Sequence, residues 1–302
     1  MIEVKACCLC ENHPGNDVFI QAKDYLVSHR IFSVVRCPQC GLVLTNPRPA
    51  DDKLPAYYQS HDYLSHSGQA STLTEKIYQA VKRLMLRKKV YFLKKWLREG
   101  DHILDVGTGT GDFPLQMKKA GIHAIGVEPN EAAAALARAK GLEVYADLSS
   151  VHAEGRKSFA MITLWHVLEH MADPNEQIGL IRNLLRHDGM LVVAVPMIDS
   201  YDAAYYKQYW AAYDLPRHLV HFSSTTLVQL LNKHGFQLIE KRSLPFDAYY
   251  ISLLSESHMN VLVKPLAWLR AIYTGLMSNI RYWSGRRPAS SQVFVFGPKF
   301  AP

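Results

Sequence analysis

The feature that most constrains this chain is a run of three closely spaced glycines after a short apolar segment, in the sequence ILDVGTGTGDF at residues 103–113. Gly107, Gly109 and Gly111 lack a Cβ atom, so the backbone can turn sharply and a ligand can lie directly against it. The amides of a helix that begins at such a turn point towards whatever is bound there. A strand, a glycine turn and a helix in this order are typical of the first unit of an open α/β fold.

The residues after this turn alternate in the way expected of parallel α/β folds. Over residues 102–197, stretches of helical length separate five short apolar runs: HILDV, AIGVE, LEVYA, FAMITLW and MLVVAV. This alternation predicts βαβ units and a doubly wound, Rossmann-like parallel sheet. Apolar periodicity also predicts a helix over 72–98 and another over 223–235, which the strand FQLIEKRSL follows.

Two carboxylates that end neighbouring strands are placed to recognise a nucleoside. Glu128 closes the second strand, where a carboxylate can accept hydrogen bonds from both hydroxyls of a ribose. Asp147 follows the third strand and is a candidate partner for an adenine amino group. The glycine spacing is G-x-G-x-G, not the G-x-G-x-x-G of dinucleotide enzymes. A tight structural turn and a solvated strand end are the alternative interpretations.

The order of the motifs DVGTGTG, GVEPN, YADL, WHVLEHMADP and LLRHDGMLVVAVP resembles that of class I S-adenosylmethionine-dependent methyltransferases. The resemblance covers residues 75–245 and the last strand, and it implies a seven-stranded sheet whose last strand, 292–297, is antiparallel. The glycines would line the methionine and ribose part of the cofactor, S-adenosyl-L-methionine. Asp105 would support the turn or the ammonium group of the cofactor. Glu128 would hold the ribose, and Asp147 with Leu148 would contact the adenine.

The fourth strand ends in LWHVLEH, and ligands of open α/β sheets bind beyond the carboxyl ends of the strands. Trp165 is therefore predicted to contact the cofactor, and His166 and His170 are candidate catalytic residues. Methyl transfer to a hydroxyl or an acidic carbon requires that a proton be removed, and a histidine with a pKa near ~6.5 can accept one. The alternative for His170 is a structural histidine bonded to the backbone.

The same segment matches H-x-x-E-H, the inverted zinc-peptidase motif. That motif lies within a helix in peptidases, whereas here it follows a buried strand, which argues against peptidase activity. Quinone-biosynthesis O-methyltransferases have a similar LEH sequence, with an acidic residue in place of His166, and some hold a divalent metal there. A histidine at this position favours a base over metal assistance.

The aromatic segment WAAYDLPRHLVHF at 210–222 supplies further candidates. His218 is a rival to His166 for the role of base. Arg217 either binds an acceptor carboxylate or phosphate or pairs with Asp214 in a packed lid.

All five cysteines lie in the first forty residues, which indicates a local site. Cys7-x-x-Cys10 and Cys37-x-x-Cys40 form two knuckles that predict a tetrahedral Zn²⁺ site, with Cys8 as an additional thiol. The sequence CGLVLTNPRP resembles the amino-terminal zinc-binding modules of bacterial methyltransferases, including sugar C-methyltransferases. Four thiolates leave no open position on the metal, so the expected role is structural.

These observations predict a zinc-ribbon-like module at 1–60, a basic linker helix at 61–100 and a methyltransferase domain at 101–302. A basic amphipathic insertion is expected at about 248–290 within that last domain. Pro265, Gly275 and Gly285 weaken the helical interpretation of this insertion.

Positive charge is concentrated in two segments. Residues 75–99 hold nine Lys or Arg against two Glu, and the chain from Lys264 onwards holds six basic residues and no acid. Such segments are typical of proteins with an anionic partner, although a solvated helix face explains residues 75–99 equally well. Peripheral membrane contact through residues 264–287 is one candidate, with an oligomer contact or a cover for the sheet as alternatives.

The predicted function is methyl transfer to oxygen or carbon of a small-molecule or lipid-linked acceptor. The alternative is an RNA methyltransferase that holds nucleic acid with the zinc module and the basic helix, although the N-P-P-Y motif of many base methyltransferases is absent. A protein that binds the cofactor without turnover is a third possibility. The longest apolar run, Met190 to Ile198, is too short to span a bilayer, and no signal-peptide pattern occurs, so a cytoplasmic protein is expected.

Overall fold

The computed structural model describes residues 1–58, 73–156, 158–259 and 263–299. The predicted boundary between zinc module and linker helix, at residues 60 and 61, lies outside these ranges. The chain divides into two compact units. Unit 1 comprises Met1–Tyr63, His166–Asn175 and Val193–Val295. Unit 2 comprises Leu64–Trp165, Glu176–Val192 and Phe296–Pro302. Each unit is thus built from segments that are far apart in the sequence.

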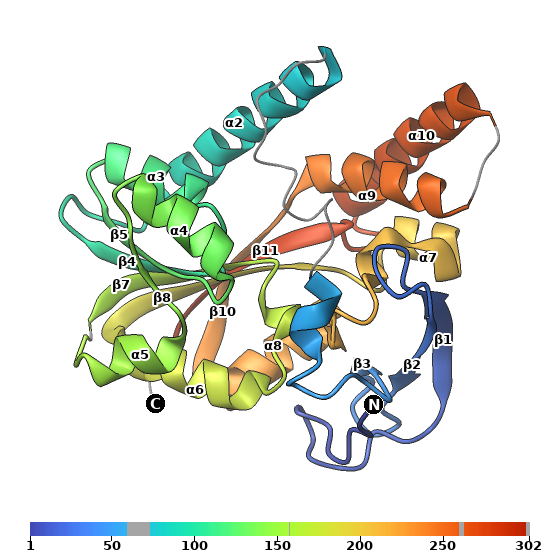
Figure 1. Cartoon of the computed structure of the whole chain (residues 1–302), viewed down its shortest axis with the longest axis horizontal. Helices are drawn as coiled ribbons and strands as arrows, with labels where there is room; N and C mark the ends of the chain where they lie inside the picture. The colour runs from blue at the N-terminus through green and yellow to red at the C-terminus, as the bar shows by residue number, and fades with distance from the viewer. Residues whose placement is uncertain (59–72, 157, 260–262, 300–302) are drawn as a thin grey trace. The chain divides into compact units, whose positions relative to one another are not determined.

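The apolar runs predicted as strands form a seven-stranded sheet (Figure 1). Its strands are β4 (His102–Val106), β5 (His123–Val127), β6 (Glu143–Tyr145), β7 (Phe159–Trp165), β8 (Leu185–Pro196), β10 (Phe236–Ser243) and β11 (Ser291–Pro298). They lie in the order β10-β11-β8-β7-β4-β5-β6. Strand β4 pairs in parallel with β5 and β7, and β5 pairs in parallel with β6. The predicted Rossmann-like α/β sheet is confirmed.

This strand order places the topological switch point at β4. The chain moves from β4 outwards to β5 and β6, and then returns to the other side of β4 with β7. Ligands of open α/β sheets bind at the carboxyl ends of the strands beside such a reversal. The glycine turn follows β4 and Trp165 ends β7, so both predicted cofactor-binding segments lie at this point in unit 2.

Helices connect the strands, and polar residues cap several of them. The helices of this part of the chain are α2 (Leu73–Lys94), α3 (Asp112–Lys119), α4 (Glu131–Ala139), α5 (Leu148–Ala153), α6 (Pro174–Leu184) and α8 (Ser224–Lys233). Asn130 caps α4 by accepting a hydrogen bond from the amide of Ala133 at 3.1 Å. Ser223 and Thr226 form a reciprocal capping box at the start of α8.

Unit 1 contains a second, four-stranded antiparallel sheet in the order β1-β2-β3-β9. Its strands are β1 (Val18–Lys23), β2 (Ile31–Arg36), β3 (Val43–Thr45) and β9 (Val220–His221). The first three belong to the predicted zinc module, whereas β9 comes from the aromatic segment at 210–222. The amino-terminal strands are therefore completed by β9, which pairs with β3 although Val220 comes 176 residues after its partner Leu44.

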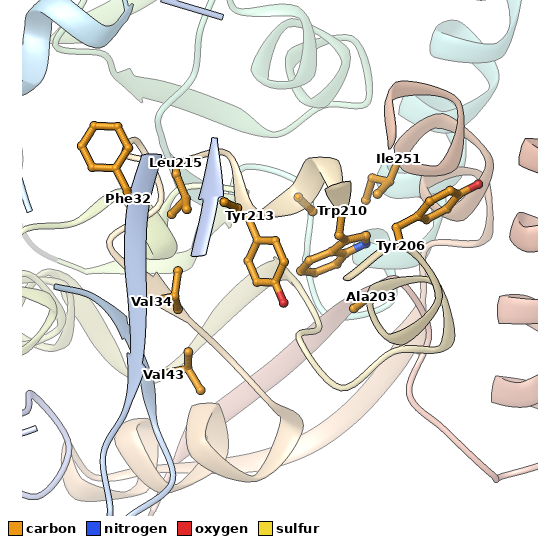
Figure 2. Packing of buried hydrophobic residues seen from close by; sticks show 11 residues of the cluster. Phe32, Val34, Val43, Ala203, Tyr206, Trp210, Tyr213, Leu215 and Ile251 are labelled. Carbon is orange, nitrogen blue, oxygen red and sulfur yellow. The ribbon is translucent and has the colours of Figure 1, made fainter. Parts of the chain in front are cut away.

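A hydrophobic cluster in unit 1 packs this sheet against short helices (Figure 2). Phe32 and Val34 from β2 belong to this cluster together with Tyr213 and Leu215 of the aromatic segment, and Trp210 lies further along it. The neighbouring short elements are η1 (Leu54–Tyr58), η3 (Leu168–His170), α7 (Tyr201–Tyr206), η4 (Lys207–Tyr209) and η5 (Ala211–Tyr213). The aromatic segment is thus a packed part of unit 1 and not a loose loop.

The insertion expected at about 248–290 forms two well-packed helices, α9 (Pro245–His258) and α10 (Lys264–Trp283). The residues that weakened the helical interpretation are tolerated for local reasons. Pro265 lies in the first helical turn, where its missing amide costs nothing, and Gly285 lies beyond the helix end. Gly275 lets α10 approach α9 closely, because a Cβ there would be 2.7 Å from Cδ1 of Tyr249. Among the described residues, no helix is both long and apolar enough to cross a membrane.

Candidate functional site

The glycine turn after β4 uses backbone conformations that favour glycine. Gly107, Gly109 and Gly111 have φ angles of 70°, 56° and 78°. A Cβ on Gly109 would meet nothing within 4 Å, so this residue faces open space. A Cβ on Gly111 would lie 2.3 Å from the Leu142 side chain, so this glycine is required for packing of the turn. The turn therefore offers a bare backbone surface at Gly109.

Glu128, at the end of β5, holds the turn. Its Oε2 accepts a hydrogen bond from the amide of Gly109 at 2.8 Å, and its Oε1 accepts one from the amide of Asn130 at 2.9 Å. The side chain is half-buried. Each carboxylate oxygen can accept more than one hydrogen bond, so a ribose could still bind here. Glu128 thus lies where a ribose-binding carboxylate was predicted, and it also fixes the shape of the turn.

Asp105 lies beneath the turn at the end of β4 and is buried. Its Oδ1 accepts a hydrogen bond from the Thr163 hydroxyl at 2.6 Å. Burial raises the pKa of Asp105 to about 6, although the neighbouring hydroxyls of Thr163 and Thr108 favour the charged form. Of the two predicted roles, this geometry favours support of the turn over contact with a ligand.

Two further predicted cofactor residues occupy the start of α5. Asp147 caps this helix, because its Oδ1 accepts hydrogen bonds from the amide and the hydroxyl of Ser150 at 2.7 and 2.8 Å. Its side chain is exposed, whereas Leu148 is buried. Contact of either residue with an adenine stays a prediction.

Trp165 ends β7, where its ring packs edge-on against Phe113 at 5.5 Å between ring centroids. The Nζ atom of Lys89 lies 3.9 Å from the Trp165 ring centroid. The buried Nε1–H of Trp165 has no hydrogen-bond acceptor within the described part of the chain. A buried donor without a partner is costly, so a ligand that accepts this hydrogen bond would stabilise the site. Trp165, together with the glycine turn and Glu128, therefore fits a polar nucleoside cofactor.

His166 follows Trp165 directly in the sequence and is held between two carboxylates of unit 1. Its φ angle is 57°, an unusual value for a residue with a side chain. Nε2 lies 3.2 Å from Asp247 Oδ2, and Nδ1 lies 3.5 Å from Glu169 Oε1. Burial alone would lower the pKa of His166, but the neighbouring carboxylates of Asp247 and Glu169 raise it to about 9. His166 is consequently a cation at neutral pH.

His170 and His218 lie side by side, with 4.5 Å between their ring centroids. Nδ1 of His170 lies 2.9 Å from the Tyr58 hydroxyl and 3.1 Å from the carbonyl oxygen of Arg217. Nδ1 of His218 lies 2.9 Å from the carbonyl oxygen of Ala212. Carbonyls only accept hydrogen bonds, so these carbonyl contacts are hydrogen bonds in the tautomer that has its proton on Nδ1 and its lone pair on Nε2. Burial, reinforced by His218, lowers the pKa of His170 to about 4.

Glu169 is buried beside these rings. Neither of its carboxylate oxygens accepts a hydrogen bond from a described residue. One of its oxygens and one ring nitrogen each of His170 and His218 lie within 4.8 Å of one another. These ligand types could also hold a cation, but we assign no metal to them. The arrangement places a negative charge where a neighbouring imidazole can gain a proton.

Sequence reasoning did not identify three partners of these side chains: Asp247 beside His166, Tyr58 beside His170 and Asp24 beside Arg217. Asp247 belongs to the first turn of α9, and Tyr58 and Asp24 come from the amino-terminal segment. No sequence motif marks them. Arg217, considered for an acceptor anion, is instead buried: it donates hydrogen bonds to Asp214 at 2.7 Å and Asp24 at 3.2 Å. These contacts fit the interpretation in which Arg217 pairs with Asp214 in a packed lid.

The four predicted metal ligands come together in unit 1. Sγ of Cys7 lies 3.5 Å from that of Cys40, and the Sγ atoms of Cys10 and Cys37 are also 3.5 Å apart. These separations are far longer than the ~2.05 Å of a disulfide and close to the roughly 3.8 Å expected around a tetrahedral metal with ~2.3 Å bonds. All four sulfurs lie within 4.8 Å of one another, and Cys8 is not among them. The donor set fits Zn²⁺, although the bound metal stays a prediction.

We expect one zinc per chain by elemental analysis, and we expect Cys37→Ser to lose it because three thiolates bind Zn²⁺ more weakly than four. Cys8→Ser is the matched control, since it removes a neighbouring thiol outside the cluster and should retain the metal. A native protein without metal, or equal zinc in both variants, would contradict this assignment.

The fold and the turn are those of a Rossmann-like α/β protein with a glycine turn at its topological switch point. Residues 77–241, more than half of the chain, match the family model described as a methyltransferase domain. The chain therefore belongs to the methyltransferase family, as its motifs predicted.

Curated relatives share part of this domain. The ubiquinone biosynthesis O-methyltransferase of Caulobacter sp. (strain K31) is 33% identical over 103 residues, which are 32% of this chain and 41% of that protein. The enzyme of the same name from Hahella chejuensis is 34% identical over 85 residues, or 25% of this chain and 34% of that protein. The chain thus matches less than half the length of these relatives.

A solved structure shows the same fold. Magnesium protoporphyrin IX methyltransferase from Synechocystis PCC 6803, crystallised with bound SAH, has a TM-score of 0.50 and 11% identity. The comparison covers 77% of this chain and 90% of that one.

Proposed function

We propose that this protein catalyses S-adenosylmethionine-dependent methyl transfer to oxygen or carbon of a small-molecule or lipid-linked acceptor. The observation that carries the proposal is the bare turn at Gly109, held by Glu128, in a chain of the methyltransferase family. When bound, the cofactor supplies a methyl group activated by a positively charged sulfur.

Residues of unit 2 would hold the cofactor. Gly107 and Gly109 offer backbone to its methionine and ribose parts, and Glu128 would accept hydrogen bonds from the ribose hydroxyls. The Trp165 Nε1–H is a further donor. Asp147 and Leu148 are assigned to the adenine from the family motif, and Asp105 and Gly111 support the turn.

The proton lost by the acceptor would move to the histidine cluster formed by Glu169, His170 and His218. In the tautomer that donates Nδ1–H to a backbone carbonyl, the Nε2 lone pair of His170 or His218 would accept the proton. The buried carboxylate of Glu169 would stabilise the imidazolium that forms. This cluster follows β7 directly in the chain.

His166 would act differently from the other two histidines. A histidine with a pKa of about 9 already carries its proton at neutral pH, so it donates a hydrogen bond instead of accepting a proton. A fixed positive charge of this kind can stabilise the negative charge that develops on an acceptor as it loses its proton. We therefore assign the base to His170 or His218.

The pH dependence of turnover separates these roles. If the charged form of His166 is required, kcat should fall as the pH rises through about 9, because His166 then loses its proton. Asp247→Asn removes a carboxylate that raises this pKa, so the alkaline limb should move to lower pH. The measurement is kcat against pH for both proteins at saturating cofactor.

A base role for His166 predicts the opposite sign. In that case kcat would rise towards pH 9, and Asp247→Asn would make the rise begin at lower pH. That outcome would return the base to His166.

The acceptor is identified by incubating the protein with methyl-labelled cofactor and a cell extract, followed by mass spectrometry of labelled products. A labelled small molecule or lipid supports the proposal, and label in RNA would favour the alternative. Absence of label, with the cofactor bound at saturation, would indicate a binding protein without turnover.

Within the described ranges of the chain, no specific contact favours the RNA alternative. Two basic side chains of the predicted basic helix region lie over aromatic rings of the chain itself: Lys89 over Trp165 at 3.9 Å and Lys95 over Trp96 at 4.8 Å. Part of the positive charge expected to face a polyanion is therefore used within unit 2.

A further inference from the structure

Helix α10 has the reverse of the usual arrangement of polar and apolar faces. Its buried residues are small or polar: Ala271, Thr274, Gly275, Ser278 and Asn279. Its exposed residues include Leu266, Trp268, Leu269, Ile272, Tyr273, Leu276, Ile280 and Trp283, each with 41–65% of its surface accessible. From Leu269 onwards, these apolar residues recur at the spacing of one helical face. An apolar helix face in water marks an interaction surface.

The polar inner face is explained by the contacts of unit 1. The hydroxyl of Ser278 donates a hydrogen bond to the buried carboxylate of Asp202 at 2.7 Å, and Asn279 donates one to the carbonyl of Pro245 at 3.0 Å. Arg270 lies 3.2 Å from the buried Glu256. The helix is thus anchored through polar groups, and these contacts do not require its outer side chains to be apolar.

The segment that carries this face has charge of one sign. The chain from Lys264 onwards contains six basic residues and no acidic ones. Lys264 lies at the start of α10, and Arg286 and Arg287 follow its end, all three of them exposed. Trp268 lies near the beginning of the helix and Trp283 at its end. Tryptophan and basic residues at the borders of an apolar face are typical of segments that lie at a membrane surface.

We propose that α10 lies in the plane of an anionic membrane surface, with its apolar face in the lipid and its basic residues at the headgroups. The charge favours this occupant over a second copy of the chain, because a symmetric contact would bring the same basic residues together. A helix of 20 residues is about 30 Å long, but its buried polar face keeps it on the surface. The inference goes beyond the proposed function and does not depend on it.

Flotation of the full-length protein with vesicles tests this directly. Wild-type protein should float with phosphatidylcholine vesicles that contain phosphatidylglycerol, and much less with phosphatidylcholine alone. High salt should weaken the binding, because it screens the basic residues. The double variant Leu269→Glu, Ile272→Glu should lower the partition coefficient roughly tenfold or more, since it places two charges on the lipid face.

Leu136→Glu is the matched control: this residue of α4 is exposed to a similar degree (46%) and should leave flotation unchanged. Circular dichroism melting of all three proteins checks that the α10 variant is folded. Binding that is equal in the wild type and the α10 variant would overturn the proposal. So would a wild-type dimer that ignores vesicles and becomes a monomer in the variant, because the occupant would then be a second copy.

Discussion

Replacing Gly109 with valine is expected to abolish cofactor binding, with the Kd for S-adenosylhomocysteine raised roughly a hundredfold or more, which is about 2.7 kcal/mol. The residue has a φ angle of 56°, which β-branched side chains rarely adopt. Its Cβ would also point into the open space where the cofactor is proposed to bind. Isothermal titration calorimetry measures the effect.

Gly100→Val separates loss of the site from loss of stability. Gly100 precedes the amino end of β4, has a φ angle of 83°, and a Cβ there would meet nothing within 4 Å. It therefore imposes the same kind of backbone strain at the opposite end of the strand from the turn. We expect this variant to melt at a lower temperature and yet to bind the cofactor. Unchanged affinity in Gly109→Val would contradict the proposed site.

The second large effect is expected in the histidine cluster. Loss of a general base commonly lowers kcat by about 10²- to 10⁴-fold. We expect an effect of this size for either His170→Ala or His218→Ala, whichever residue is the base, while calorimetry shows an unchanged Kd for the cofactor. The partner histidine should have a smaller effect, because it orients its neighbour and does not itself accept the proton.

His187→Ala is the control for this series, since that side chain is 89% exposed and does not belong to the cluster. If neither His170→Ala nor His218→Ala reduced kcat by more than a few fold, the proton would leave by another route. Circular dichroism of each variant guards against misfolding, because both rings are hydrogen-bonded to the backbone.

The features of the fold that could be predicted are those set by local sequence patterns, such as apolar runs and the spacing of glycines and cysteines. Strands such as β4 and β7 are short apolar runs beside a glycine turn or a cap, so the sheet and the position of Gly109 followed from the sequence. The cysteine spacing likewise predicted a cluster of four thiols. Each of these features depends on residues that are close together in the chain.

The remainder depends on contacts between distant segments. Asp247 is 81 residues beyond His166, and no sequence motif indicates that its carboxylate lies beside that histidine and keeps it protonated. Strand β9 joins an amino-terminal sheet that looked like a separate module. Gly275 of α10 packs closely against Tyr249 of α9, a contact that the local sequence does not indicate. Tertiary packing decided these features, and it overrode local propensity at Gly275.

The most direct test of the central claim is a crystal structure of the protein with S-adenosylhomocysteine. The account predicts that the ligand lies against Gly109, with a ribose hydroxyl about 2.6–3.2 Å from the Glu128 carboxylate. A ligand bound elsewhere, or a turn that stays empty at saturating concentration, would contradict it.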